Sequence, residues 1–280
     1  MSQVEKGKLY ICPTPIGNLE DITLRTLKVL EEVDLIAAED TRHSIKLLNH
    51  YDIKKPLTSY HEHNIKEKGP DLIEKLKAGL NIALVSDAGM PGISDPGEDL
   101  IGLAIAEAIE IIVLPGATAS ITALVASGLP TGKFVFEGFL SAKKKERIDE
   151  LKALEDEKKT MIIYESPHRL LDTLEDMLLV LGNRKIAIIR ELTKMYEEIF
   201  RGNIEEGIER FSSGKIKGEF VLIIEGIKES DVELNIDIEE ELLRYIDQGL
   251  SKKESVKKVV EEFKLPRNEV YQKSLGLDKR

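Results

Sequence analysis

Three loops rich in glycine and proline carry the residue types best suited to hold a small ligand. They span residues 13–18 (Pro-Thr-Pro-Ile-Gly-Asn), 86–97 and 115–119 (Pro-Gly-Ala-Thr-Ala). Glycine lets the backbone approach a ligand closely, and proline fixes the shape of a loop. Asp87 follows an apolar run and could accept a hydrogen bond from a ligand hydroxyl or amine. One such loop is usually an ordinary turn, but three on successive strands favour a shared cleft.

The loops lack two familiar nucleotide-binding patterns, the GxxxxGK[ST] P-loop and the GxGxxG dinucleotide turn. The segment His61-Glu62-His63 contains metal-ligand types, but its alternate spacing suits a strand and no third ligand motif accompanies it. We therefore expect no metal site, because nothing here selects a coordination geometry. Arg42 and Arg169 could contact phosphate, since a guanidinium matches phosphate oxygens in pairs.

The elements that must position these residues follow from short apolar runs. In the first half we expect strands at residues 8–12, 35–38, 82–85 and 111–114, a helix capped by Thr23 and a helix at 119–127. Strands that alternate with helices predict a parallel sheet covered on both faces. In such sheets ligands bind beyond the carboxyl ends of the strands, where the three loops lie.

The second half changes character, and a third piece follows it. We expect strands at residues 161–164, 185–190 and 219–225, with helices near 170–181 and 204–211. After Ile236, Ser251 caps a helix with Val256, Val259, Val260 and Phe263 on one face, and another helix covers 268–274. This pair is similar to a helix-turn-helix. The predicted domains are residues 1–140, 141–230 and 236–280.

Composition limits the function classes. The 280 residues are 42% hydrophobic and 32% charged, and no run reaches the ~18 apolar residues of a membrane span. No secretory signal is expected, and the single cysteine, Cys12, favours a buried position in a cytoplasmic protein. The net charge of −11 argues against an overall nucleic-acid binder. Residues 133–147 nevertheless carry five cations against two carboxylates, a local charge of +3.

The run at residues 83–97, Ala-Leu-Val-Ser-Asp-Ala-Gly-Met-Pro-Gly-Ile-Ser-Asp-Pro-Gly, resembles the signature of a known enzyme family. That family is the 16S rRNA (cytidine-2′-O)-methyltransferases, called ribosomal RNA small subunit methyltransferase I. Collinear supporting segments are residues 13–18, 38–43, 59–64, 114–119, 136–140, 164–169 and 190–194. The resemblance spans roughly Leu9 to Ile224, and weaker motifs continue into the last helices.

The resemblance implies an α/β fold, the two-domain tetrapyrrole-methylase (class III methyltransferase) fold with a small C-terminal helical extension. It also implies S-adenosylmethionine in the cleft between the domains, a homodimer, and 16S rRNA or the 30S subunit as partner. The cofactor residues carried over are Pro15, Asp87, Met90, Ile93, Thr118, Ala119, Tyr164, Leu192, Glu219 and Val221. The expected RNA contacts are Arg42, His43, Lys143, Lys144, Lys145, Arg147 and Arg169.

Methyl transfer to a ribose hydroxyl benefits from a general base, because a hydroxyl is a poor nucleophile. The candidates, in descending order, are Asp40, Glu39 and His61. Two other functions stay open on the residues alone. One is a methyltransferase acting on a precorrin-like tetrapyrrole, which shares the fold. The other is a non-catalytic RNA- or ribosome-binding module, against which the intact loops and Asp87 count.

Overall fold

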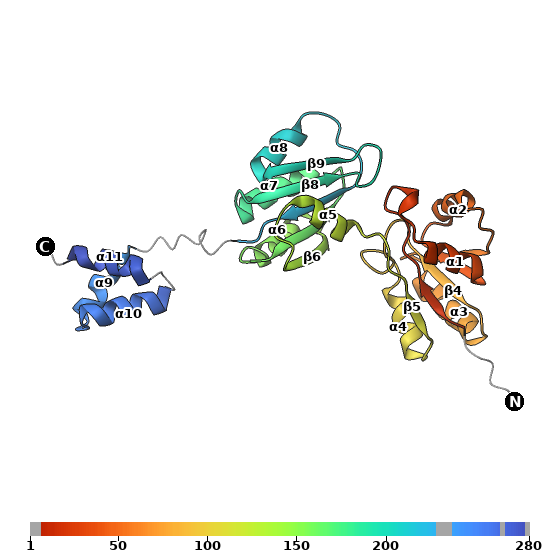
Figure 1. Ribbon diagram of the computed structural model, residues 1–280, viewed down its shortest axis with the longest axis horizontal. Helices are drawn as coiled ribbons and strands as arrows, with labels where there is room; N and C mark the ends of the chain where they lie inside the picture. The colour runs from red at the N-terminus through yellow and green to blue at the C-terminus, as the bar shows by residue number, and fades with distance from the viewer. Residues whose placement is uncertain (1–6, 228–236, 264–266, 278–280) are drawn as a thin grey trace. The chain divides into compact units, whose positions relative to one another are not determined.

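The structure is a computed structural model that describes residues 7–227, 237–263 and 267–277 (Figure 1). The chain divides into two compact units, residues 1–226 and 227–280. The first unit contains two five-stranded sheets, and the second contains three helices. Among the described residues, no helix has the length and apolar character needed to cross a membrane.

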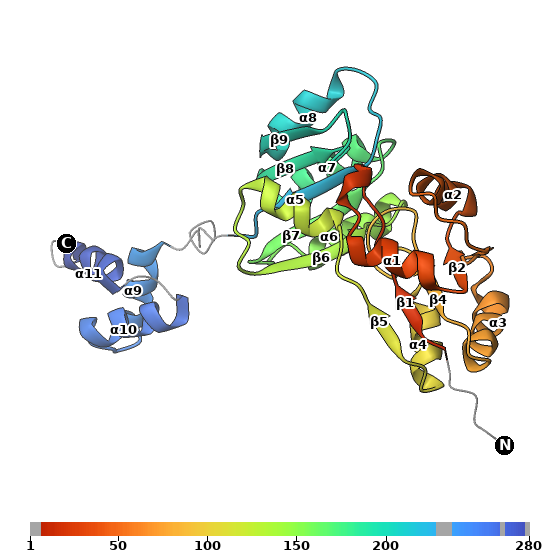
Figure 2. The same cartoon turned by 45° about the vertical axis from the view of Figure 1, so that its right-hand side comes forward.

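The first sheet is parallel, with strand order β3-β2-β4-β1-β5. Its strands are β1 (Leu9–Ile11), β2 (Leu35–Ala38), β3 (Leu57–Ser59), β4 (Ile82–Val85) and β5 (Ile111–Val113). Its helical segments are η1 (Leu19–Asp21), α1 (Leu24–Glu32), α2 (Thr41–His50), α3 (Ile65–Lys77) and α4 (Glu98–Ala106). Residues of α3 and α4 pack on one face, and residues of α1 and α2 pack on the other (Figure 2).

Burial on both faces explains why the first-sheet strands are short apolar runs. All four residues of β4 are buried, because this central strand is covered from both sides. Thr23 caps α1 by accepting a hydrogen bond from the Thr26 amide at 3.0 Å, which confirms the predicted cap. The carboxyl ends of β2, β3 and β4 lie side by side, since Ala38 pairs with both Ser59 and Val85.

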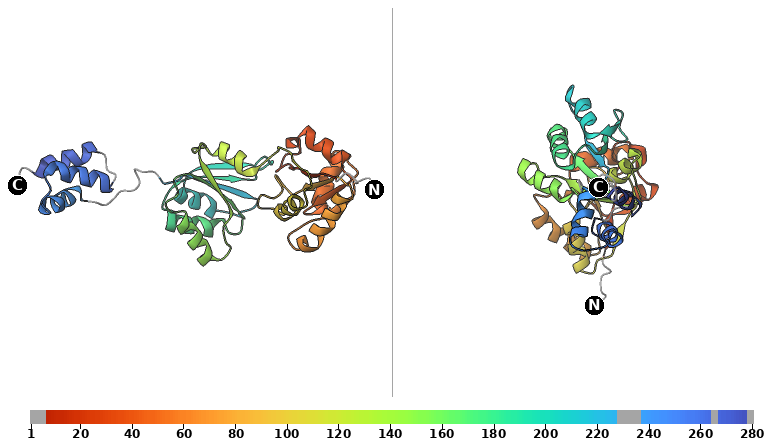
Figure 3. Two further views of the ribbon diagram at one scale, coloured as in Figure 1. Left: turned by 90° about the horizontal axis from the view of Figure 1, so that it is seen from below. Right: turned by 90° about the vertical axis from the view of Figure 1, so that its left-hand side faces the viewer.

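The second sheet is mixed, with strand order β6-β7-β10-β8-β9. Its strands are β6 (Phe134–Phe139), β7 (Thr160–Glu165), β8 (Lys185–Arg190), β9 (Glu198–Asn203) and β10 (Phe220–Ile224). Its helices are α5 (Ala119–Ser127), α6 (Lys144–Ala153), α7 (Leu170–Leu181) and α8 (Ile204–Ser212). Only the β6–β7 pair is parallel among these described strands. Residues of α6, α7 and α8 pack on one face, and α5 packs on the other (Figure 3).

The C-terminal unit consists of α9 (Ile238–Asp247), α10 (Lys252–Phe263) and α11 (Arg267–Gly276). Leu242, Val256, Val259 and Val270 form its own small core. The predicted cap at Ser251 is confirmed, because its Oγ accepts a hydrogen bond from the Glu254 amide at 3.4 Å.

Two expectations from the sequence need correction. Residues 61–63 do not form a strand, because β3 ends at Ser59 and a turn leads into α3. The second sheet begins before residue 141, since β6 starts at Phe134 and pairs with β7. The three-domain division remains a prediction, and its boundary between 230 and 236 lies outside the described residues.

Candidate functional site

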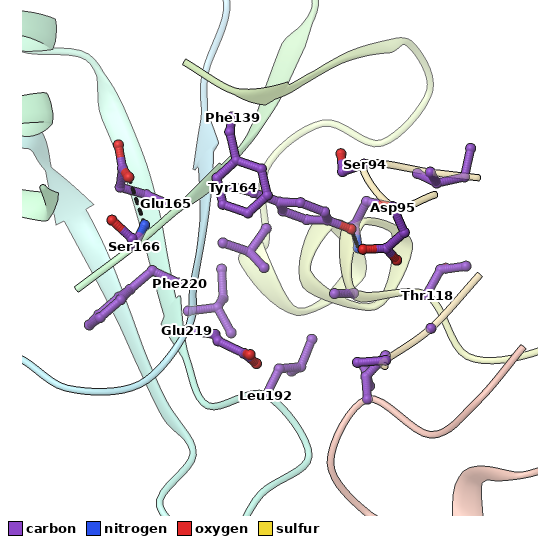
Figure 4. A pocket seen from close by; sticks show the side chains of 18 of the residues that line it. Ser94, Asp95, Thr118, Phe139, Tyr164, Glu165, Ser166, Leu192, Glu219 and Phe220 are labelled. Carbon is purple, nitrogen blue, oxygen red and sulfur yellow. Dashed lines mark hydrogen bonds between the residues drawn. The ribbon is translucent and has the colours of Figure 1, made fainter. Parts of the chain in front are cut away.

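A cavity of about 290 Å³ lies between the loops of the first sheet and one face of the second (Figure 4). Its walls are largely apolar, with a few hydroxyl and carboxyl groups. The lining residues are Ile16, Ala88, Gly89, Met90, Ile93, Ser94, Asp95, Thr118, Ala119, Ser120, Phe139, Tyr164, Glu165, Ser166, Pro167, Ile189, Leu192, Glu219, Phe220 and Val221. An apolar pocket with a small number of polar groups is the usual form of a cofactor site.

The three loops predicted to share a cleft hold one another in place. Thr14 and Gly89 exchange both backbone hydrogen bonds, at 2.9 and 3.1 Å, and Thr14 Oγ1 donates to the Ser86 carbonyl at 3.1 Å. Gly89 has a φ of 82°, a conformation that disfavours other residues. A Cβ on Gly116 would lie 2.6 Å from Pro13 Cβ, so the first and third loops also touch. The result is a continuous wall of backbone.

The opposite wall comes from the second sheet, with Tyr164 at its centre. The Tyr164 hydroxyl accepts a hydrogen bond from the Ser120 amide at 3.1 Å, a contact drawn in Figure 4. Its ring packs edge-on against Phe136 and Phe139, with centroids 5.0 and 5.5 Å away. Burial raises the pKa of Tyr164, so its hydroxyl stays neutral near pH 7.

Eight of the ten residues expected to touch the cofactor line this cavity. They are Met90, Ile93, Thr118, Ala119, Tyr164, Leu192, Glu219 and Val221. Pro15 and Asp87 are absent from the lining, although their neighbours Ile16 and Ala88 belong to it. Asp87 joins two strand tips instead: its Oδ1 accepts from the Asp40 amide at 3.1 Å, and its own amide donates to Glu39 Oε2 at 3.4 Å. The expected direct cofactor contact of Asp87 is therefore corrected to a supporting position.

Sequence reasoning missed Asp95, whose carboxyl group lines the cavity. Burial raises its pKa to about 7, and the negative charges of Glu39, Asp87 and Glu219 add to the effect. Ser94, just before it, has a φ of 60°, unusual for a residue other than glycine. The sequence signal was a second aspartate in the signature loop, but residue type alone does not show which aspartate faces the cavity.

The three candidate bases differ in their surroundings. Asp40 caps α2 and binds Arg42, with Oδ1 accepting from the Arg42 amide at 2.8 Å and Oδ2 from Nη2 at 2.7 Å. The Arg42 contacts lower the pKa of Asp40 to about 2, which makes it a weak proton acceptor. Burial raises the pKa of Glu39, and repulsion from Asp87 and Asp40 adds to this, although the Asp87 amide opposes it.

His61 is the third candidate base. Its Nε2 lies 3.3 Å from Asn64 Nδ2, and its buried Nδ1 has no hydrogen-bond partner. The rings of His61 and His63 are 6.0 Å apart. In the described part of the chain, no group of three or more His, Cys, Asp or Glu side chains could hold a metal ion.

The expected RNA contacts separate into exposed and enclosed side chains. Arg42 and His43 are exposed on α2, and Lys145 is exposed on α6. Lys143 pairs with Glu146 at 2.9 Å, and Lys144 reaches Asp176 at 3.5 Å.

Two of the expected RNA contacts are corrected. Arg147 is buried and pairs with Asp176 at 2.6 Å, so its guanidinium stabilises the fold and does not reach solvent. Arg169 is largely enclosed, pairing with Glu165 at 2.7 Å and donating to the Leu140 carbonyl at 2.9 Å. A charged group needs such partners when it is buried.

Comparisons with known proteins agree with this architecture. Residues 8–207 match the model of the Tetrapyrrole (Corrin/Porphyrin) Methylases. A ribosomal RNA small subunit methyltransferase I from Halalkalibacterium halodurans is 52% identical, with 95% of this chain and 94% of the relative covered. Proteins of the same name from Synechocystis sp. and Bacillus subtilis are 48% and 47% identical, with 97% and 95% of this chain and 99% and 94% of those proteins covered.

Solved structures share the fold at low sequence identity. A cobalt precorrin-4 methyltransferase has a TM-score of 0.58 at 16% identity, covering 78% of this chain and 94% of that one. A uroporphyrin-III C-methyltransferase from Thermus thermophilus, complexed with S-adenosyl homocysteine, has a TM-score of 0.55 at 18% identity, covering 78% and 97%. The family model and the full-length identity together show that this chain belongs to the tetrapyrrole methylases and, within them, to the ribosomal RNA small subunit methyltransferase I family.

Proposed function

We propose that this chain methylates the ribose 2′-hydroxyl of a cytidine in the decoding region of 16S rRNA. Membership of its family makes it an S-adenosylmethionine-dependent methyltransferase of small-subunit rRNA. The observation that carries the finer proposal is the row of carboxyl groups at the first-sheet strand tips, where a base could meet a hydroxyl. Glu39 lies at this edge, and its charge acts on Asp95 in the cavity wall.

The cavity residues fit S-adenosylmethionine. Ile16, Ile93 and Leu192 offer apolar surface for an adenine ring. Asp95 and Glu219 offer carboxylates to the positive charges of the cofactor and to its ribose hydroxyls. When bound, S-adenosylmethionine supplies an electrophilic methyl group. The chain supplies alignment and exclusion of water, which together contribute about 7–11 kcal/mol when the geometry is good.

Glu39 is the residue we propose as general base. Its raised pKa makes it a better proton acceptor than Asp40, whose pKa is about 2 and whose oxygens are occupied by Arg42. Its carboxylate takes the proton that the ribose 2′-hydroxyl loses as its oxygen is methylated. A positioned base of this kind typically contributes a ~10²–10⁴-fold acceleration.

A homodimer in the cytoplasm is part of the same proposal. The edge strand β5 leaves Val113 57% exposed, and Ile105 on α4 is 65% exposed, so this edge offers apolar surface for self-association. Analytical ultracentrifugation of the protein tests the dimer. A monomer at all accessible concentrations contradicts it.

The substrate test uses labelled S-adenosylmethionine with three acceptors: 30S subunits, free 16S rRNA and a precorrin-like tetrapyrrole. We expect label in the RNA, and mass mapping of the digested RNA to place one methyl group on a cytidine ribose. Label on a base, or on another nucleotide, overturns the 2′-O-cytidine proposal. Label in the tetrapyrrole alone would favour the small-molecule reaction that shares this fold.

A further inference from the structure

A second, smaller pocket of about 60 Å³ lies at the end of strands β8 and β9. Its lining residues are Arg190, Glu198, Arg210, Phe211, Ser213, Gly214, Lys215 and Ile216. Arg190 is the last residue of β8, and its register partner Glu198 is the first residue of β9. Arg210 comes from the last turn of α8. Three cations thus converge on one carboxylate.

Hydrogen bonds fix two of these cations in position. Arg210 Nη2 donates to Glu198 Oε1 at 2.5 Å, and Arg190 Nη1 donates to Glu198 Oε2 at 3.4 Å. Arg190 Nε donates to the Lys217 carbonyl at 2.7 Å, which holds its guanidinium at the pocket. The Arg210 guanidinium also lies over the Phe211 ring, 5.6 Å from its centroid. One carboxylate leaves a local charge of +2, on a chain whose total is −11.

The small pocket is adjacent to the large cavity. Ile189, the residue before Arg190, lines the large cavity, and so does Phe220, which pairs with Arg190 across β8 and β10. Successive residues of a strand point to opposite faces. Arg190 therefore lies at the same end of the sheet as the cavity lining, on the side covered by α8.

We propose that the pocket of Arg190, Arg210 and Lys215 binds a backbone phosphate of the rRNA substrate while the target ribose is presented to the large cavity. Two guanidinium groups and an ammonium suit a phosphodiester, since guanidinium binds phosphate oxygens in pairs. A phosphate would compete with Glu198 for the same donors. This inference rests on the proposed function, because it takes rRNA as the substrate.

The test measures binding of a 16S rRNA fragment at several salt concentrations, with cofactor affinity measured separately by calorimetry. For Arg210→Gln with Lys215→Gln we expect roughly tenfold weaker RNA binding. We also expect a shallower salt dependence, by about 0.7 in slope per lost contact with single-stranded RNA. Glu198→Gln should bind RNA more tightly, because it removes the competing charge. Lys185→Gln, at the opposite end of β8, is the matched control and should leave both quantities unchanged.

Each outcome separates this inference from the proposed function. Wild-type protein that methylates rRNA while the double variant keeps its affinity and salt slope overturns the phosphate site alone. Glu198→Gln binding less tightly than wild type also contradicts it. Wild-type protein that does not bind rRNA overturns the proposed function instead. Inorganic phosphate should compete with the RNA only weakly, and RNA binding that saturating phosphate abolishes would identify a free-anion site.

Discussion

The backbone amide of Asn18 donates a hydrogen bond to Thr193 Oγ1 at 3.1 Å, and this bond ties a loop of the first sheet to a loop of the second. The neighbours Ile16 and Leu192 both line the large cavity. Thr193 has a φ of 65° and Glu191 a φ of 51°. Such backbone conformations each cost on the order of 1 kcal/mol or more and persist where surrounding contacts enforce them. The loop-to-loop contact therefore sets the width of the cavity.

Gly17→Ala should weaken S-adenosylmethionine binding by opening this contact. A Cβ at Gly17 would lie 2.5 Å from Thr193 Oγ1 and 2.9 Å from the Leu192 carbonyl oxygen, so the two loops must move apart. Calorimetric titration should show an affinity at least several-fold lower. Gly102→Ala is the control, since a Cβ there meets nothing within 4 Å. Equal affinity of Gly17→Ala and wild type would show that the contact does not shape the site.

Glu39→Gln should slow methyl transfer by about 10²–10⁴-fold, because the amide cannot accept the ribose proton. Cofactor affinity should stay near that of wild type, since Glu39 does not line the cavity. Asp40→Asn should retain most activity, because asparagine also caps a helix well. Single-turnover rates with rRNA check both variants. If Asp40→Asn is the slow variant and Glu39→Gln is not, the two assignments are reversed.

Asp95 should make cofactor affinity depend on pH. Its carboxyl has a pKa of about 7 in the absence of ligand, and the positive charges of S-adenosylmethionine favour its ionised form. Affinity should therefore rise between about pH 6 and pH 8, with proton release on binding below pH 7. Calorimetry in buffers of different ionisation enthalpy measures both effects. A flat profile, or the same profile in Asp95→Asn, would remove Asp95 from the cofactor site.

The same carboxyl should lower the stability of the ligand-free protein as pH rises. The folded protein keeps a proton that the unfolded chain releases from the usual pKa of 3.8 upward. The free energy of unfolding therefore falls as pH rises from about 4 to 7, and this contribution is constant above that range. Thermal unfolding should show Asp95→Asn gaining on wild type across this window. A constant difference in Tm between the two proteins would contradict the raised pKa.

Arg147→Ala should destabilise the protein without changing the salt dependence of RNA binding. Arg147 and Asp176 have side chains only 4% exposed, and removal of one partner leaves a buried charge uncompensated. The expected cost is about 3–5 kcal/mol of unfolding free energy. Lys145→Gln, on the exposed side of the same helix, should leave stability unchanged. Denaturant unfolding distinguishes the two, and an Arg147→Ala protein as stable as wild type would mean that the ion pair contributes nothing.

Much of the fold was predictable because apolar runs reveal buried strands. Residues 35–38, 82–85 and 185–190 match β2, β4 and β8, and 119–127 matches α5. Elements with weaker patterns were not predicted. The edge strand β9 is polar and only partly buried, and α3 contains Pro70, which usually interrupts a helix. Neither element has an apolar period long enough to identify it.

The site was predictable where backbone and apolar residues form it. Resemblance placed Thr118, Tyr164 and Val221 in the cavity wall, because loop and strand order fix their positions. The direction of individual polar side chains was not predictable. Asp87 and Asp95 share one loop, and the left-handed backbone at Ser94 lies next to the aspartate that lines the cavity. Burial of Arg147 likewise depends on Asp176, which is distant in sequence.

The most direct test of the cofactor site is a crystal structure of this protein soaked with S-adenosylhomocysteine, the demethylated product. We predict density inside the large cavity, between Ile16 and Thr118 on one side and Tyr164 and Val221 on the other, with Asp95 within hydrogen-bond distance. Density elsewhere on the protein, with this cavity empty at a saturating concentration, would contradict the account.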